Sequence, residues 1–284
     1  MPSITARDEK TGRKFTLDDP DDLKSGEPVT FILSLHGGGS VGAWQHAYFP
    51  ISDVKEKYRL VIATPSAATK VPARRWVGEA DDEHLRAIVE TVFAKYNVER
   101  FWLAGHSQGG MTSRRLLATD PFFQRRVDGF LSLSGGRIGP AERAPGFSVP
   151  LPPGQKLNFP AMPPLPDITA PISHIFAVGE HEIASLPATS PLAAGPRERR
   201  PDIVDSEGGK IHDTTRESYS TKGWGLKPGP GRAEVFVYPA DGRVVADVVR
   251  IDKGHTEGLE PKVTEELVRM MVSAPGGTAR SAAL

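Results

Sequence analysis

The chain has 284 residues, 38% of them hydrophobic, and its 35 Lys and Arg residues equal its 35 Asp and Glu residues in number. This length allows one substantial core, so a single domain over 1–284 is expected, and the balanced charge gives no general attraction to nucleic acid or to an acidic membrane surface. The chain contains no cysteine, which excludes disulfides, thiol catalysis and cysteine-bound metals.

The sequence also lacks the signals of membrane insertion and export. No apolar run approaches the roughly 20 residues that span a bilayer. The first ten residues are polar and of mixed charge, so no signal peptide is expected. A secreted or periplasmic location would therefore require a leader that had already been removed.

Short apolar segments alternate with helical patterns in the first half of the chain. Residues 29–35 and 60–64 are predicted as buried strands, with a helix over 44–58 between them. Acidic residues at 81–83 begin a second predicted helix that runs to residue 93, and a strand over 98–104 follows.

The alternation continues in the second half. A helix is expected after residue 107, ending at Asp120-Pro121. Further predicted elements are strands over 127–134, 172–178, 233–238 and 244–251, the last two flanking a hairpin turn at Asp241-Gly242, and an amphipathic helix over 261–272. Strands that alternate with helices predict an α/β fold, with a mostly parallel sheet covered by helices on both faces.

Two segments interrupt this pattern. Residues 138–170 are rich in Pro and Gly where a crossover helix would be usual, and residues 183–232 contain Pro-Arg-Glu-Arg-Arg-Pro. Both are predicted to be irregular insertions, and the second is a candidate lid, because long loops in a compact domain commonly have such a role.

Ser107 is the candidate nucleophile. The strand over 98–104 leads directly into Gly105-His106-Ser107-Gln108-Gly109 and then into a helix, the arrangement that exposes a serine on a strained turn. The glycines two residues to either side let the backbone approach closely. His106 is expected to point away from the serine.

A second match to the same pattern surrounds Ser40. It is disfavoured because glycines crowd residues 37–42, no helix starts directly after the serine, and only about 30 residues precede its strand.

A serine hydroxyl needs an imidazole to accept its proton. His255 is the candidate base, because Lys253-Gly254-His255 follows the final strand, where a loop can reach over the sheet edge. His212, within the second insertion, is the alternative.

The candidate acid lies in Gly179-Glu180-His181-Glu182. Glu182 is preferred, because hydrolases of this type commonly place the acid three residues after the glycine, and Glu can replace Asp in a triad. Glu180 is the alternative, and Asp205 and Asp213 are more remote ones. No metal is expected here, since no metal-ligand spacing accompanies the cluster.

The tetrahedral intermediate of acyl transfer carries an oxyanion that backbone N–H groups stabilise. Leu35-His36-Gly37-Gly38-Gly39 supplies a suitable loop. The oxyanion hole is assigned to the amides of Gly38 and of Gln108, the residue after the nucleophile, with Gly39 as an alternative to Gly38.

These motifs together resemble the polyhydroxybutyrate depolymerase and feruloyl esterase group of α/β-hydrolases, which includes poly(aspartic acid) hydrolases. The resemblance rests on Leu-His-Gly, Gly-His-Ser-Gln-Gly-Gly-Met and the late Gly-His. It implies an α/β-hydrolase fold and cleavage of esters or amides through an acyl-enzyme, without a cofactor. The group often has Cys where this chain has Gly38, and usually Asp where it has Glu182.

Basic and aromatic residues near the expected site are candidate substrate contacts. Arg74, Arg75, Trp76 and Arg137 follow predicted strands, and Arg197, Arg199 and Arg200 lie in the second insertion. They favour an anionic chain such as poly(aspartate), because guanidinium groups bind carboxylates bidentately. Alternatively these arginines are ordinary solvated charges, and Trp44, Trp76 and Trp224 line an apolar cleft for a polyester or aromatic ester.

The sequence therefore predicts a serine hydrolase whose partner is a polymeric ester or amide, without nucleic acid or membrane. A small-molecule carboxylesterase or feruloyl esterase, an acyltransferase, and a noncatalytic binding protein on the same fold are the alternatives. Monomer and homodimer both remain open.

Overall fold

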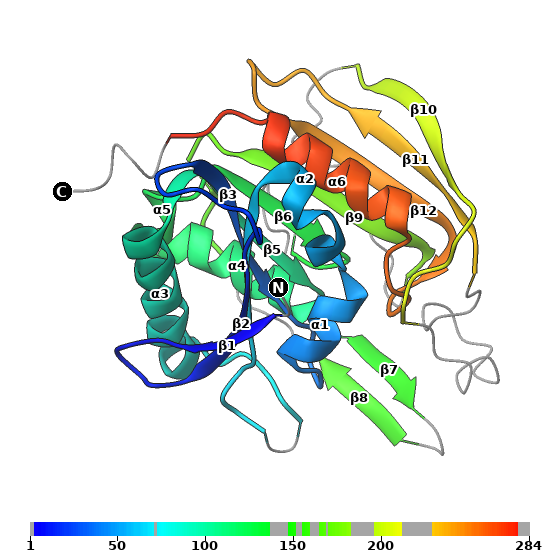
Figure 1. Cartoon of the computed structure of the whole chain (residues 1–284). Coiled ribbons are helices and arrows are strands. Elements are labelled where there is room, and N and C mark those ends of the chain that lie inside the picture. Colours follow the sequence, from blue (N-terminus) through cyan, green and yellow to red (C-terminus); the bar gives the residue numbers. More distant parts are fainter. Residues whose placement is uncertain are drawn as a thin grey trace.

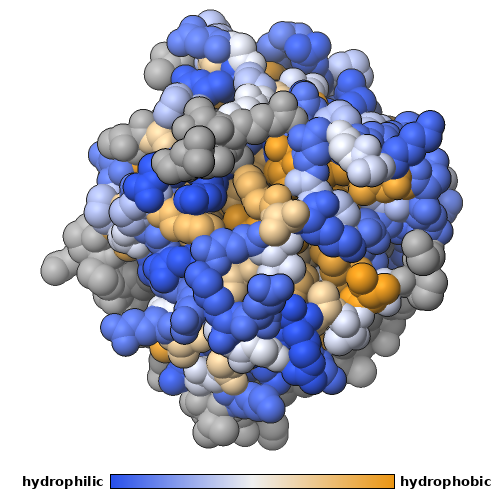
Figure 2. Space-filling model, turned by 60° about the vertical axis from the view of Figure 1, so that its left-hand side comes forward, coloured by the Kyte–Doolittle hydropathy of each residue, from blue (hydrophilic) through white to orange (hydrophobic). Residues whose placement is uncertain are grey.

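The structure of the chain is a computed structural model. It describes residues 3–70, 73–136, 147–151, 155–159, 165–168, 170–182, 196–211 and 229–277. No helix among these residues is both long and apolar enough to cross a membrane. On the face shown in Figure 2, hydrophilic residues form most of the surface and hydrophobic residues show in patches between them.

A ten-stranded sheet forms the centre of the molecule (Figure 1), in the order β1-β2-β4-β3-β5-β6-β9-β12-β11-β10. The six strands from β4 to β12 are parallel to one another, and two antiparallel strands extend the sheet at each edge. In chain order the strands of this sheet are β1 (Ile4–Arg7), β2 (Lys14–Asp18), β3 (Pro28–Leu35), β4 (Leu60–Pro65), β5 (Asn97–His106), β6 (Gly129–Leu133), β9 (Ser173–His181), β10 (Glu198–Asp205), β11 (Gly231–Val237) and β12 (Val245–Gly254). The predicted α/β class with a mostly parallel sheet is confirmed.

Helices cover both faces of this sheet. They are α1 (Gly42–Tyr48), the 3₁₀ turn Ile51–Val54, α2 (Lys55–Tyr58), α3 (Gly78–Lys95), α4 (Gln108–Thr119), α5 (Pro121–Gln124) and α6 (Pro261–Ser273). Successive residues of a strand point to opposite faces, and β3 follows this rule. Leu33 packs in a core cluster with residues of α3 and α4, whereas Ile32 packs in a second cluster with residues of α1 and α6.

The helix predicted over 44–58 is divided in the structure. α1 ends at Tyr48, and a 3₁₀ turn begins at Ile51. Pro50 lies between them and has no N–H to continue a helix, which explains the break. Farther along the chain, α3 starts at Gly78, before the predicted acidic start, because the Asp81 carboxylate accepts a hydrogen bond from the Val77 N–H at 2.8 Å.

Both predicted insertions contain regular structure. Strands β7 (Phe147–Leu151) and β8 (Gln155–Phe159) form a separate hairpin within 138–170, at the lower right of Figure 1. Within 183–232, β10 pairs with β11 and becomes the edge of the main sheet. The prediction that residues 198–205 are irregular was wrong. Hydrogen bonding to β11 stabilises a strand there, although the segment contains Pro201 and several charged residues.

The parallel strands place their carboxyl ends along one edge of the sheet, where α/β proteins commonly bind ligands. The residues that directly follow β3, β5, β9 and β12 are His36, Ser107, Glu182 and His255. The candidate residues of the sequence are thus brought to the same edge.

Candidate active site

Ser107 occupies a sharp turn between β5 and α4. Its backbone has φ 51° and ψ −116°, an unfavourable conformation for a residue with a side chain. A Cβ on Gly105 would lie 2.3 Å from the backbone carbon of Gly109, and one on Gly109 would lie 2.3 Å from the Leu35 carbonyl oxygen. Glycine is therefore required at both positions, as expected for a serine presented on such a turn.

Ser40 has a different setting. It lies in a turn in which its N–H donates to the Gly37 carbonyl at 3.2 Å, and α1 starts two residues later. The positive φ of Ser107 is not found at Ser40. The structure thus gives Ser40 none of the strained strand-to-helix geometry that exposes a nucleophile.

His255 and Glu182 form a close pair. The His255 Nδ1 lies 2.6 Å from the Glu182 Oε2, and both side chains are buried, at 5% and 6% exposed. The other carboxylate oxygen, Oε1, accepts hydrogen bonds from the Ser134 hydroxyl at 2.5 Å and from the Gly179 N–H at 3.2 Å. Glu182 is therefore oriented by groups from three strand ends.

Burial raises the pKa of the Glu182 carboxyl, but the charge and hydrogen bond of His255 and the donors on Ser134 and Gly179 outweigh it. The net effect is a pKa below the ordinary value of 4.5. Glu182 is consequently ionised at neutral pH and suited to stabilise an imidazolium at His255.

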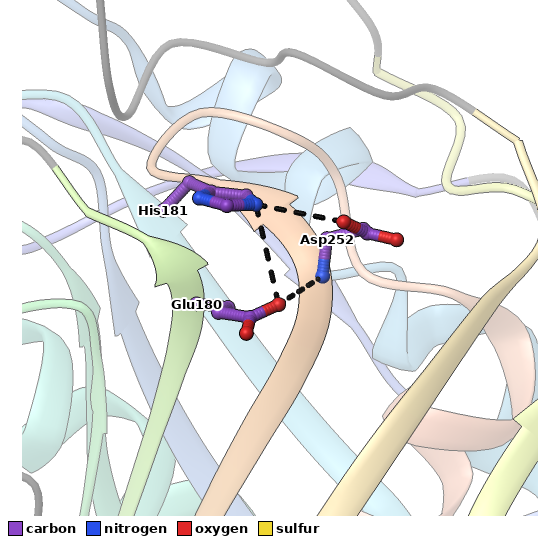
Figure 3. A group of neighbouring side chains, drawn as sticks. All are labelled: Glu180, His181 and Asp252. Carbon is purple, nitrogen blue, oxygen red and sulfur yellow. Dashed lines mark hydrogen bonds and ion pairs between the residues drawn. The ribbon is translucent and has the colours of Figure 1, made fainter.

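The alternative acid, Glu180, has other partners. Its Oε2 accepts the Asp252 N–H at 2.9 Å and lies 4.0 Å from the His181 Nε2. His181 in turn lies 3.5 Å from the Asp252 Oδ1. Figure 3 shows these three residues, which come from the ends of β9 and β12. Their ligand atoms lie within 4.8 Å of one another, and both carboxylates are exposed.

Of the more remote candidates, Asp205 has another hydrogen-bond partner, and the others lie outside the described residues. The Asp205 carboxylate accepts the Lys262 N–H at 2.5 Å in the first turn of α6. Asp213 and the alternative base His212 lie outside the described residues.

Gly38 and Gln108 lie side by side. A Cβ on Gly38 would be 3.5 Å from the Gln108 Oε1. The Gly39 N–H donates to the Arg74 carbonyl at 2.7 Å, whereas the N–H groups of Gly38 and Gln108 have no hydrogen-bond partner within the described part of the chain. The N–H groups of Gly38 and Gln108 are therefore the candidate donors of an oxyanion hole.

His36 fixes the start of the glycine loop. Its Nε2 accepts the Ala67 N–H at 3.0 Å, so the proton is on Nδ1, which donates to the Gly37 carbonyl at 2.7 Å. Burial lowers the pKa of His36 to about 4. The ring is consequently neutral at pH 7 and keeps this tautomer.

His106 contacts the candidate base, His255. The sequence did not predict this contact. The His106 Nε2–H donates to the His255 carbonyl at 2.8 Å, and the two rings are 4.7 Å apart. Burial, reinforced by the neighbouring His255, holds the pKa of His106 well below its usual value. The residue that precedes the nucleophile therefore ties the base-bearing loop to the elbow.

Arg250 also contacts the loop after β12, which carries His255. Its guanidinium donates to the carbonyls of Glu257 at 3.0 Å and Gly258 at 2.7 Å. It also pairs bidentately with the Glu260 carboxylate at 2.9 and 3.1 Å. All three of these residues follow His255, so this buried arginine determines the path of the loop that presents the base.

The candidate substrate contacts near β4 lie close to the glycine loop. The Arg74 side chain is half-buried and donates to the Ala67 carbonyl, and Arg75 is exposed. Trp76 is buried, with only 7% of its surface exposed. Arg137 lies outside the described residues.

The arginines of the second insertion have local partners at the far edge of the sheet. Arg197 lies over the Phe236 ring at 4.1 Å. Arg199 pairs with Asp202 and Glu234 at 3.0 and 2.9 Å, and Arg200 with Glu198 at 3.3 Å. Since β11 separates β10 from β12, these cations are remote from His255 in the sheet order.

One of the candidate tryptophans lies next to the site. Trp44 is partly exposed, stacks on Tyr48 at 4.7 Å and lies 5.2 Å from the His106 ring. It is thus available as an apolar contact for a substrate. Trp224 lies outside the described residues.

Comparisons with known proteins bear on the fold of the chain. The family model of the alpha/beta hydrolase fold matches residues 29–164. Among solved structures, acetyl xylan esterase from Aspergillus awamori has a TM-score of 0.54 at 12% identity, covering 94% of this chain and 98% of that one. Est1E from Butyrivibrio proteoclasticus has a TM-score of 0.48 at 12% identity, covering 95% and 97%.

A shorter match is the fluorophosphonate-binding serine hydrolase FphF from Staphylococcus aureus, with a TM-score of 0.43 at 14% identity, covering 63% of this chain and 79% of that one. No curated protein matches the chain in sequence.

Proposed function

We propose, on the basis of the α/β-hydrolase fold of this chain, that it is a serine hydrolase that cleaves carboxylic esters through an acyl-Ser107 intermediate. The carrying observation is the buried His255–Glu182 pair at 2.6 Å, held beside the strained Ser107 turn by the His106–His255 hydrogen bond. This pair follows β9 and β12 and the Ser107 turn follows β5, which supports a base, an acid and a nucleophile that act together.

The chemistry follows from these positions. His255 accepts the proton of the Ser107 hydroxyl as its oxygen attacks the ester carbonyl, while Glu182 stabilises the imidazolium. The N–H groups of Gly38 and Gln108 bind the oxyanion of the tetrahedral intermediate. The intermediate expels the alcohol, which takes the proton from His255. Water then attacks the acyl-enzyme by the same route and releases the acid and free Ser107.

Small neutral esters are the proposed substrate class. The local ion pairs of Arg199 and Arg200 leave them little role in recognising an anionic polymer. Trp44 instead offers an apolar surface beside His106. A polymeric ester or poly(aspartate) stays a prediction from the sequence resemblance, and we include both in the substrate test.

Covalent labelling tests the nucleophile. A fluorophosphonate probe should label the native chain, and Ser107→Ala should abolish both labelling and hydrolysis of p-nitrophenyl butyrate. Ser40→Ala serves as the matched control and should retain both. Labelling that persists in Ser107→Ala, or disappears in Ser40→Ala, would overturn the assignment.

A substrate panel tests the rest of the proposal. It contains p-nitrophenyl butyrate, methyl ferulate, acetylated xylan, 3-hydroxybutyrate oligomers and poly(aspartate), with kcat/KM as the measurement. The small esters are expected to be the best substrates, and a higher value on poly(aspartate) would refute this substrate class. Added alcohol that outcompetes water would identify a transferase, and no turnover of any ester would favour a binding protein.

A further inference from the structure

Trp76 lies beneath the glycine loop, away from solvent. Its indole Nε1–H donates to the His36 carbonyl at 2.8 Å, and its ring packs on the His36 ring at 4.7 Å between centroids. The carbonyl that it holds belongs to the peptide leading into Gly37. The indole therefore fixes the direction in which the glycine loop leaves β3.

The backbone of the same segment holds both sides of the oxyanion hole. The Arg74 carbonyl accepts the Gly39 N–H at 2.7 Å, directly after Gly38. The Trp76 N–H donates to the Gln108 Oε1 at 3.2 Å. One short segment, Arg74–Trp76, is thus bonded to the glycine loop and to the residue after the nucleophile, which carry the two oxyanion donors.

We propose that Arg74–Trp76 is a brace that sets the geometry of the oxyanion hole, with Trp76 as its positioning residue. This inference rests on the proposed serine hydrolase function. Oxyanion donors act at about 2.7–3.1 Å from the developing charge, so a small displacement of Gly38 weakens binding of the transition state. Substrate binding in the ground state depends less on this geometry. A displacement of Gly38 should therefore lower kcat and leave KM nearly unchanged.

Trp76→Phe is the direct test, because it keeps an aromatic ring and removes the indole N–H. We expect kcat to fall about tenfold, the effect of losing one hydrogen bond that orients the loop, with little change in KM. Rates are expressed per active site titrated with the fluorophosphonate, so a loss of folded protein does not enter kcat.

Trp102→Phe is the matched control. Trp102 is fully buried in β5, and its indole nitrogen has no hydrogen-bond partner among the described residues. The same substitution there changes packing without removing a bond to the oxyanion loop. It should therefore lower stability while leaving kcat per active site close to the native value.

A trifluoromethyl ketone distinguishes positioning from a general structural role. It forms a tetrahedral adduct with the nucleophilic serine, whose oxyanion occupies the hole. In Trp76→Phe its inhibition constant should rise by the same factor by which kcat/KM falls, whereas in Trp102→Phe it should not change. Unchanged kcat and inhibition constant in Trp76→Phe, or equal losses in both variants, would overturn the brace.

The two proposals fail in different ways. If Ser107→Ala keeps its activity, the serine hydrolase function itself is refuted. If Ser107→Ala is inactive while Trp76→Phe matches the native enzyme in kcat and in ketone affinity, the function stands and only the brace is refuted.

Discussion

Glu182 differs from Glu180 in its partners, although the two are only two residues apart. Glu182 is buried against His255, whereas Glu180 is exposed and accepts a backbone N–H from Asp252. The two carboxylates thus have different surroundings, and those of Glu182 are consistent with the preference that its spacing from Gly179 gave in the sequence.

We expect Glu182→Gln to lower kcat by about 10³ to 10⁴-fold, because an amide cannot stabilise the imidazolium at His255. Glu180→Gln is the matched control, and its kcat should stay close to native. Steady-state kinetics with titrated active sites measures both. A larger loss in Glu180→Gln than in Glu182→Gln would show that the acid was assigned to the wrong residue.

His36 makes stability depend on pH. Its pKa is about 4 in the folded chain, against 6.5 when exposed. Between these values the unfolded chain binds more protons, so the free energy of unfolding falls as pH is lowered from 6.5 toward 4. The contribution of His36 over this window is about 3 kcal/mol.

Urea unfolding of the native chain and of His36→Asn at several pH values measures this term. The variant lacks the titrating ring but keeps an N–H donor near Gly37, so its stability should decline less steeply over the same window. Parallel declines in the two proteins would exclude His36 as a source. The other buried histidines contribute equally to the pH dependence of both proteins, so their contributions cancel in the difference.

Residues with a distinctive local pattern were predictable, and residues that act through folding were not. Gly105, Ser107 and Gly109 form a recognisable motif, and His255 follows a strand. Ser134, by contrast, is one serine after an apolar strand, and only the adjacency of β6 and β9 places its hydroxyl on Glu182. Its place at the carboxyl end of a parallel strand was the available signal.

At the scale of elements, the central strands were predicted well and the edges poorly. β3, β4 and β5 are buried on both faces and therefore appear in the sequence as continuous apolar runs. β1 is exposed and only four residues long, and β10 is mostly charged. Such strands form because a neighbour offers free hydrogen-bonding groups, and their own sequence carries little sign of it.

The loop after β12 depends on a buried ion pair. Arg250 and Glu260 are 3% and 2% exposed, so removing the guanidinium leaves the buried Glu260 carboxylate with the more distant Lys253 Nζ, at 3.6 Å, as its charged partner. We expect Arg250→Met to lower the free energy of unfolding by about 3–5 kcal/mol and to reduce kcat, because His255 loses its support.

Arg269→Met is the control for this substitution. Arg269 pairs with Glu266 at the surface, with 65% of its side chain exposed, and the change should cost no more than about 0.5 kcal/mol. Denaturant unfolding measures both variants. Equal stability of Arg250→Met and the native chain would show that the ion pair does not support the loop.

At the scale of the whole molecule, charge is balanced and locally paired. The chain has 35 basic and 35 acidic residues, and the arginines of β10 have acidic neighbours. Long-range steering of an anionic substrate is therefore weak.

We expect kcat/KM for neutral and anionic esters of equal size to respond little to NaCl concentration. The variants Arg199→Ala and Arg200→Ala should leave the preference between these esters unchanged. A steep fall in kcat/KM with salt for the anionic ester alone would instead indicate that cations recognise the substrate.

The two outermost strands, β1 and β10, also affect whether copies of the chain can associate through the edges of the sheet. Pro201 lies within the interruption of β10 pairing between Arg200 and Ile203, and the strand carries charges along its length. At the opposite margin, β1 ends after four residues. Short length, proline and charge are the features by which natural sheets resist strand addition. We therefore expect both margins of the ten-stranded sheet to resist the addition of a strand from a neighbouring copy.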